Sequence, residues 1–262
     1  MKIITYLTDF GTKSSYVAQM KGVALSITDA RLIDITHEIS PQNIREGAFI
    51  LSTAVKFFPT GTVHVAVVDP GVGTERRGIV VTTPKYVLVG PDNGLLMPAA
   101  HYPGDFAVYE IKNTAYMLPN ISDTFHGRDI FTPIAANILN GLPFDQIGPR
   151  ITDYVDLNFG KAEFSSTEAK GKIIFIDNFG NIITNIESRL IKGFMEYGKK
   201  IKIKIKNKQH EILFVKSYNF VNKGSILATI GSNKYLEISI NQGNAAHELD
   251  VKIDDEIQID YS

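Results

Sequence analysis

The sequence predicts an α/β protein: an N-terminal α/β sandwich domain followed by a smaller C-terminal all-β, barrel-like domain. Up to about residue 160, short β-rich runs alternate with stretches whose apolar residues recur at helical spacing. From Gly171 onward the helical pattern nearly disappears, and strand-like runs follow one another with turn residues between them. We therefore expect domains at 1–158 and 171–262, joined by a linker over 159–170.

The first domain is expected to alternate strands with helices. Apolar runs bounded by turn residues place strands at 3–8, 30–39, 62–68, 78–83 and 86–91. Apolar residues at helical spacing place helices at 15–27, 43–58 and 131–141. Pro59 stops the second helix and Gly141 closes the third.

Strands alone are expected in the second domain, at 172–177, 181–186, 199–208, 211–218, 225–231, 235–240 and 251–260. Lysine alternates with isoleucine over 200–206, which predicts a strand with one buried isoleucine face and one lysine face. Such lysines also protect exposed sheet edges. Binding of nucleic acid is disfavoured, because no aromatic stacking residues are interleaved with the lysines.

Composition excludes several classes of function. The 262 residues hold 27 Lys and Arg against 28 Asp and Glu, so no basic footprint for nucleic acid is present. Cysteine is absent, which excludes disulfides, thiolate zinc sites, iron–sulfur clusters and cysteine nucleophiles. No apolar run is long enough for a membrane span, and the N-terminus reaches Asp9 too early for a signal peptide, so we expect a cytoplasmic protein without a membrane partner.

Polar residues gather where the predicted strands of the first domain end, the place at which open α/β sheets bind ligands. Asp9 ends the first strand in TDFG (8–11), where it could bind a ribose or simply cap the next helix. Asp69 ends a buried strand in VVDPGVGTERRG (67–78), and Pro70 holds it in extended geometry. This glycine-rich loop lacks the Lys-Ser or Lys-Thr of a P-loop and runs into a strand, not a helix, so it is no standard phosphate cradle. Arg76 is equally well explained as a solvated turn residue.

Further polar clusters carry weaker signals. His126 lies before a glycine in TFHGRDIFTP (124–133), and a lone histidine is more often structural than catalytic. Asp177 and Asn181 flank a turn between strands, and turn chemistry alone also explains GSN (231–233) and NQGNAA (241–246). Metal binding has little support, since there is no His-Glu-x-x-His helix and no closely spaced histidine pair. A serine triad lacks its G-x-S-x-G elbow.

Together these segments resemble one family. TDFG, DITHEISP (34–41), VVDPGVGTERRG, GPDNG (90–94), TFHGRDIFTP, DNFGNIITNI (177–186) and NQGNAA occur in the order found in the S-adenosylmethionine hydroxide adenosyltransferases, which are related to fluorinating and chlorinating enzymes. The resemblance runs from about residue 3 to residue 259. It implies an N-terminal α/β domain, a C-terminal β domain, and a homotrimer whose sites lie between the N-terminal domain of one subunit and the C-terminal domain of its neighbour.

The resemblance also implies a set of site residues and hydrolysis of S-adenosylmethionine to adenosine and methionine without a cofactor or metal. By motif, the catalytic residues are Asp69, Arg76 and His126, and Asp9 binds the ribose. The other substrate-binding residues implied lie in the second domain: Asp177 and Ser232 at the methionine, Phe179 and Asn181 around the adenosine, and Gln242 where the adenine-contacting backbone runs.

Two departures favour water over halide as the nucleophile. Halogenating relatives carry tyrosine where this chain has Asp69, and an aromatic residue where it has Gln42. Position 233 is asparagine where the fluorinating relative has arginine, which weakens the assignment of contacts to the methionine carboxylate. A halide adenosyltransferase and a non-catalytic adenosyl-ligand sensor remain the alternatives.

The implied residues suit the reaction. Methionine leaves as a neutral thioether, so neither a general acid nor a metal is required. Asp69 can orient water and accept its proton, a role worth about 10²–10⁴ in rate. Arg76 would keep Asp69 ionised, and His126 would orient the water or relay its proton. A buried anion would also offset the cost of desolvating the sulfonium.

Overall fold

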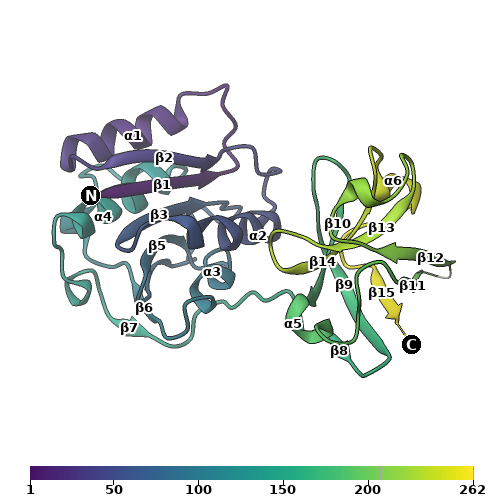
Figure 1. The fold of residues 1–262 in the computed structure, drawn as a ribbon. Helices are drawn as coiled ribbons and strands as arrows, with labels where there is room; N and C mark the ends of the chain where they lie inside the picture. The colour runs from purple at the N-terminus through teal and green to yellow at the C-terminus, as the bar shows by residue number, and fades with distance from the viewer. Residues whose placement is uncertain (207, 262) are drawn as a thin grey trace. The chain divides into compact units, whose positions relative to one another are not determined.

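The protein is described by a computed structural model covering residues 1–206 and 208–261. Asn207, within the predicted strand 199–208, and Ser262, at the end of the predicted second domain, lie outside the described residues. The chain divides into two compact units, Met1–Asn158 (unit 1) and the remainder from Phe159 (unit 2). Figure 1 shows helices and a sheet in unit 1 and a sheet curled on itself in unit 2, which confirms the predicted fold class. No helix among the described residues is long and apolar enough to cross a membrane.

Unit 1 is built on a seven-stranded mixed sheet. In spatial order it contains β2 (Arg31–Thr36), β1 (Ile3–Thr8), β3 (Thr62–Val67), β5 (Tyr86–Pro91), β4 (Gly78–Thr82), β6 (Ala107–Glu110) and β7 (Arg150–Ile151). The first four strands are parallel, and the remaining pairings are antiparallel. The carboxyl ends of β2, β1, β3 and β5 therefore meet at one edge of the sheet.

Helices cover both faces of this sheet. On one face, α1 (Tyr16–Ile27) and α4 (Thr132–Leu139) pack together, and their residues Met20 and Ile134 share a core with Ile4 and Tyr6 of β1. On the other face lie α2 (Ile44–Ala54) and α3 (Met97–His101), which contact each other. Side chains alternate along a strand, so Leu7 of β1 points to the face opposite to that of Tyr6. Leu7 meets α2 there, since a Cβ on Gly47 of α2 would lie 3.5 Å from the Leu7 side chain.

Local chemistry sets the limits of these helices. Asn43 caps α2 by accepting a hydrogen bond from the Glu46 N–H, 3.1 Å away. The helix expected over 43–58 ends as α2 at Ala54 and continues as the short turn η1 (Val55–Phe57) before Pro59. The pattern did not predict α3, β6, β7 or a π-helical turn, η3 (Gly127–Phe131), that leads into α4.

Unit 2 is a closed barrel-like sheet of seven strands. Their order is β10 (Ile182–Glu187), β14 (Tyr235–Ile240), β13 (Ile226–Ile230), β12 (Lys208–Phe214), β11 (Lys200–Ile205), β15 (Glu256–Asp260) and β9 (Glu168–Ile176). Pairing of β9 with β10 closes the barrel, and β8 (Glu163–Phe164) pairs beside β9. The segment expected as a linker, 159–170, thus carries β8 and the start of β9. Two short helices, α5 (Ser188–Ile191) and α6 (Ala245–Glu248), complete the unit.

The lysine-isoleucine run forms β11. Ile201, Ile203 and Ile205 are buried in the barrel core, and Lys202 and Lys204 are exposed, which confirms the two-faced strand. Because β11 is paired with β12 on one side and β15 on the other, its lysines do not protect a sheet edge. That part of the expectation was wrong, since closure of the barrel removes the edge.

Candidate active site

Polar residues follow four neighbouring parallel strands of unit 1. His37 comes directly after β2, Asp9 after β1, Asp69 shortly after β3, and Asp92 after β5. Thr8 is paired with Val67, so Asp9 and Asp69 follow one and two residues after the same level of the sheet. The carboxyl edge of the parallel strands therefore presents the side chains that the sequence singled out.

Asp69 is held by Arg76 in a two-pronged ion pair. Arg76 Nε lies 2.9 Å from Asp69 Oδ1 and 3.0 Å from Oδ2, and Nη2 also donates to Oδ2. The Asp69 side chain is 4% exposed and that of Arg76 is 12% exposed. The alternative of a solvated turn residue is therefore excluded for Arg76.

The loop that carries this pair packs against the segment leading to His126. Gly73 has φ +76°, and a Cβ there would lie 2.4 Å from the backbone oxygen of Asp123. Only glycine combines that left-handed backbone with so close an approach. The contact fixes the loop of Asp69 and Arg76 beside the turn from Ser122 to His126.

Arg76 also reaches His126. Arg76 Nη2 lies 2.7 Å from His126 Nδ1, and a guanidinium has donors only, so Nδ1 accepts this hydrogen bond. The neutral imidazole then carries its proton on Nε2. Burial, and next the charge of Arg76, hold the pKa of His126 below its ordinary value of 6.5. Arg76 thus bridges carboxylate and imidazole and favours a neutral histidine with an Nε2–H donor.

Arg76 is distinguished from its neighbour Arg77 by what each contacts. The Arg76 guanidinium lies 5.3 Å from the centre of the Phe131 ring, in η3. Arg77 instead bonds to Asp92 and Asp153, with Nε 2.9 Å from Asp92 Oδ2 and Nη1 3.0 Å from Asp153 Oδ1. Arg77 therefore links separate segments within unit 1, whereas Arg76 bonds to Asp69 and His126.

Asp9 sits in a turn held from two sides. The backbone N–H of Gln42, which has φ +65°, donates to Asp9 Oδ2 at 2.8 Å. His37 Nδ1 lies 2.8 Å from the Thr8 hydroxyl, and the His37 carbonyl accepts from the Gly11 N–H at 2.8 Å. The residues on both sides of Asp9 are therefore fixed by His37.

Aromatic rings connect Asp9 to His126. Phe10, directly after Asp9, and Phe125, directly before His126, pack edge to face with centroids 5.8 Å apart. A Cβ on Gly127 would lie 3.6 Å from the Phe10 ring, so the two segments are in close contact. The structure thus brings Asp9, Asp69, Arg76 and His126 into one region of unit 1.

The predicted residues of unit 2 form a tight turn. Asp177 Oδ1 accepts from the N–H groups of Phe179 and Asn181, each at 2.9 Å, and Oδ2 accepts from Asn181 Nδ2 at 2.9 Å. Asn181 is buried, whereas Phe179 is 77% exposed. The carboxylate of Asp177 therefore organises the turn, and this turn presents the Phe179 ring to solvent.

Gln242 lies close to this turn. The Ala246 N–H donates to the Gly180 carbonyl at 3.0 Å, and a Cβ on Gly180 would clash with Asn244. The loop that holds Gln242 therefore packs on the Asp177–Asn181 turn, at the end of β14. Ser232 lies in the turn that precedes β14.

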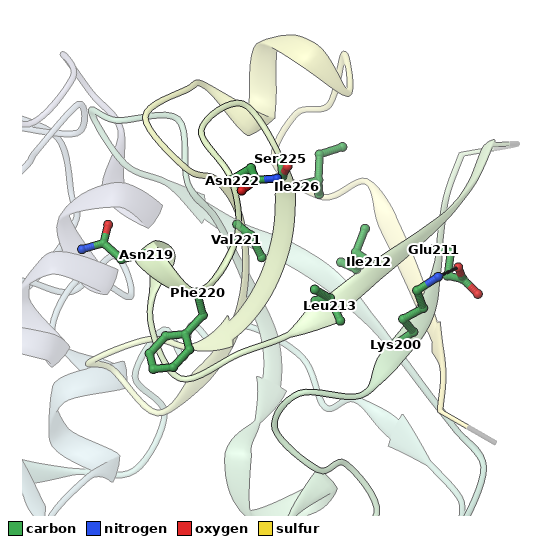
Figure 2. A pocket seen from close by; sticks show the side chains of 10 residues that line it. All are labelled: Lys200, Glu211, Ile212, Leu213, Asn219, Phe220, Val221, Asn222, Ser225 and Ile226. Atoms are coloured by element: carbon green, nitrogen blue, oxygen red, sulfur yellow. Dashed lines mark hydrogen bonds and ion pairs between the residues drawn. The ribbon is translucent and has the colours of Figure 1, made fainter.

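Unit 2 also contains a cavity of about 400 Å³ (Figure 2). It lies beside β11 and β12 and is bordered by the segment 219–222, with Ser225 and Ile226 completing the lining. The ion pair between Lys200 and Glu211, 2.6 Å long, stands at its edge. None of the predicted site residues lines this cavity.

Sequence reasoning missed two groups near Asp9. His37 stands in the quoted segment DITHEISP without a role, and only the structure shows its bonds to both flanks of Asp9. A histidine directly after the strand next to β1 was the available signal. The aromatic set around Phe10 was also missed, because residues far apart in sequence form it.

In the part of the chain that the structure describes, no three His, Asp or Glu side chains are grouped so as to hold a metal ion.

Comparison with known proteins identifies the family of this chain. Residues 4–148 match the model of the SAM hydroxide adenosyltransferase N-terminal domain, and residues 171–258 match that of the C-terminal domain. The chain belongs to the SAM hydroxide adenosyltransferase family. Within it, the chain is 42% identical to the (R)-S-adenosyl-L-methionine hydrolase of Methanocaldococcus jannaschii, over 100% of this chain and 97% of that protein.

A more distant relative and a solved structure extend the comparison. A fluorinase of Actinopolyspora mzabensis is 26% identical over 95% of this chain and 94% of its own length. The crystal structure of an uncharacterized conserved protein from Thermotoga maritima superposes with a TM-score of 0.92, at 38% identity, covering 98% of this chain and 99% of that one. Similarity to the hydrolase thus exceeds similarity to the fluorinase.

Proposed function

We propose that this chain hydrolyses S-adenosyl-L-methionine to adenosine and L-methionine, with water attacking C5′ of the ribose. The observation that carries the proposal is the group Asp69–Arg76–His126, in which one arginine holds a buried carboxylate and a neutral imidazole. The relative named (R)-S-adenosyl-L-methionine hydrolase matches the entire chain at 42% identity. This chain has Asp69 at the place where, by the resemblance, halogenating enzymes carry tyrosine.

In this proposal the two groups around Arg76 have separate tasks. His126 accepts from Arg76 at Nδ1, so its Nε2–H can donate a hydrogen bond to the oxygen of the attacking water. That bond orients the water but cannot take its proton. Asp69 receives three donor contacts from Arg76, and a carboxylate has about four lone-pair sites, so one site is left to accept the proton.

Substrate binding involves residues of both units in this proposal. In unit 1, Asp9 keeps Oδ1 for the ribose hydroxyls because the Gln42 N–H occupies Oδ2. In unit 2, we assign Phe179, Asn181 and Gln242 to the adenosine and Asp177 and Ser232 to the methionine. The side chain of Asp177 already accepts three hydrogen bonds within its own turn, so its contact with the substrate uses the remaining capacity of the carboxylate.

Product analysis tests the activity. Purified protein incubated with S-adenosylmethionine should yield adenosine and methionine by chromatography, also with chloride or fluoride present. Asp69→Asn should bind the substrate and lose at least about two decades of turnover, the effect expected for a general base. A 5′-halo-adenosine would identify a halide adenosyltransferase, and unchanged ligand would identify a sensor.

The reaction as proposed needs neither metal nor cofactor, because the leaving group is a neutral thioether. Activity should therefore be unaffected by a chelator. Loss of activity with chelator and its return with a divalent cation would contradict this.

We further propose a cytoplasmic homotrimer whose sites combine unit 1 of one copy with unit 2 of the next. Family resemblance supports the trimer, and the predicted residues do fall in both units. Co-expression of an Asp69→Asn chain with an Asn181→Ala chain should restore part of the activity that each variant lacks alone. A monomer by light scattering at working concentration would refute the trimer.

A further inference from the structure

The sulfonium of the substrate is a cation that must leave water to react. The sequence suggested that the buried anion Asp69 would compensate it. In the structure, Arg76 lies against Asp69 with two donor nitrogens, so the pair is formally neutral. This inference rests on the proposed function, and it concerns what else in unit 1 stabilises the positive sulfur.

Three aromatic rings form a cluster beside the catalytic group. Ring centroids are 5.9 Å apart for Phe10 and Tyr16, 5.8 Å for Phe10 and Phe125, and 5.1 Å for Tyr16 and Phe125. Each pair is edge to face, with interplanar angles of 69° to 75°. Phe10 adjoins Asp9 in the chain, Phe125 adjoins His126, and a Cβ on Gly127 would lie 3.6 Å from the Phe10 ring, so the cluster is built from the two segments that carry the proposed ribose-binding and water-binding residues.

The rings differ in what already covers them. Phe125 is 8% exposed, and the guanidinium of Arg128 lies 4.8 Å from its ring centre. Tyr16, the first residue of α1, is 50% exposed. A ring that served only to pack the core would be buried, whereas Tyr16 is fixed by two aromatic neighbours and still open to solvent.

Aromatic faces attract cations through the negative face of the π system, and this attraction is stronger where water is excluded. We propose that Phe10, Tyr16 and Phe125 form the subsite that receives the sulfonium, with Tyr16 supplying the accessible ring. The subsite discriminates a positively charged adenosyl substrate from its neutral thioether product. It also does so without placing a second carboxylate near the attacking water.

Binding of two unreactive ligands tests the subsite. S-adenosylhomocysteine carries a neutral thioether, and sinefungin carries a protonated amine on the carbon that replaces the sulfonium. Calorimetry on the intact protein gives the ratio of their dissociation constants. Tyr16→Leu should reduce the preference for the cationic ligand by roughly threefold to thirtyfold, the range of a cation–π contact.

Matched variants separate the subsite from general damage. Tyr16→Phe keeps the ring and should keep the preference. Tyr102→Leu, at another exposed tyrosine of unit 1, should leave both affinities unchanged. An unchanged ratio in Tyr16→Leu, with both ligands still bound, would overturn the subsite and leave the proposed function intact. If the wild type bound neither ligand, the proposed function itself would fail, and the subsite with it.

Discussion

Replacing Arg76 by glutamine should strongly destabilise unit 1, because it leaves the Asp69 carboxylate buried without its cation. The Asp69 side chain is 4% exposed and receives all three donor contacts described above from this one arginine. Breaking a buried pair from one side costs about 3–5 kcal/mol in the free energy of unfolding. We expect a loss of that size for Arg76→Gln at neutral pH.

The double variant Asp69→Asn/Arg76→Gln provides the decisive comparison. It removes the stranded charge and keeps two groups that can hydrogen bond to each other, so we expect it to recover most of the lost stability. Both proteins should be inactive, since the carboxylate or its orientation is gone.

Urea unfolding followed by circular dichroism measures these differences. If the loss comes from the unpaired buried charge, the double variant is more stable than Arg76→Gln by about 2 kcal/mol or more. A single variant within about 1 kcal/mol of the wild type would refute it. So would a double variant whose loss equals the sum of the two single losses.

Three further outcomes are expected. In the proposed mechanism activity needs neutral His126, whose pKa lies below 6.5 in the free protein, so the acid limb of the kcat/KM profile should have its midpoint below pH 6.5; a midpoint above that value contradicts the assignment. His37→Ala should raise the KM for S-adenosylmethionine about tenfold with less effect on kcat, the effect of losing one hydrogen bond that fixes the Asp9 turn through Thr8. His37→Asn, which can still bond to Thr8, should recover most of it, and equal defects in both variants would count against this positioning role. Burial lowers the pKa of His64 to about 3 from 6.5, so its contribution to stability is complete above pH 6.5 and is lost as the pH falls towards 3. Unfolding free energy should drop by about 2 kcal/mol between pH 7 and pH 5 from this group, and a His64→Gln variant with the same pH slope would disprove its origin.

Much of unit 1 could be predicted because its strands are short apolar runs with a polar residue directly after them. Asp9 and Asp69 were placed at strand ends by that pattern alone, and parallel pairing of β1 with β3 then puts them at one edge. Successive strands without helices predicted that unit 2 is all-β, as a barrel or a sandwich. The pairings of β10 with β14 and of β15 with β9 and β11 could not be predicted, because a strand shows the same apolar alternation whether its partner is a sequence neighbour or a distant strand.

The finer structure of the site could not be predicted, because it depends on contacts between distant segments. Arg76 and Arg77 are adjacent and chemically identical, yet one bonds to Asp69 and the other to Asp92 and Asp153. Which nitrogen of His126 is available is likewise decided by Arg76, 50 residues earlier in the chain. The family resemblance implied Arg76 and His126 as site residues, but only the structure shows that Arg76 lies between Asp69 and His126 and bonds to both.

The π-helical turn η3 imposes a length constraint on this site. His126 occupies its N-cap, and α4 follows it without a break from Thr132. A π turn holds one residue more than an α turn, so removing a single residue between Gly127 and Phe131 would let α4 extend as a regular helix. His126 would then rotate by about 100° around the helix axis and lose contact with Arg76. An insertion or deletion in this turn would therefore displace His126, so the number of residues between the histidine and α4 is as much a part of the candidate site as their identity.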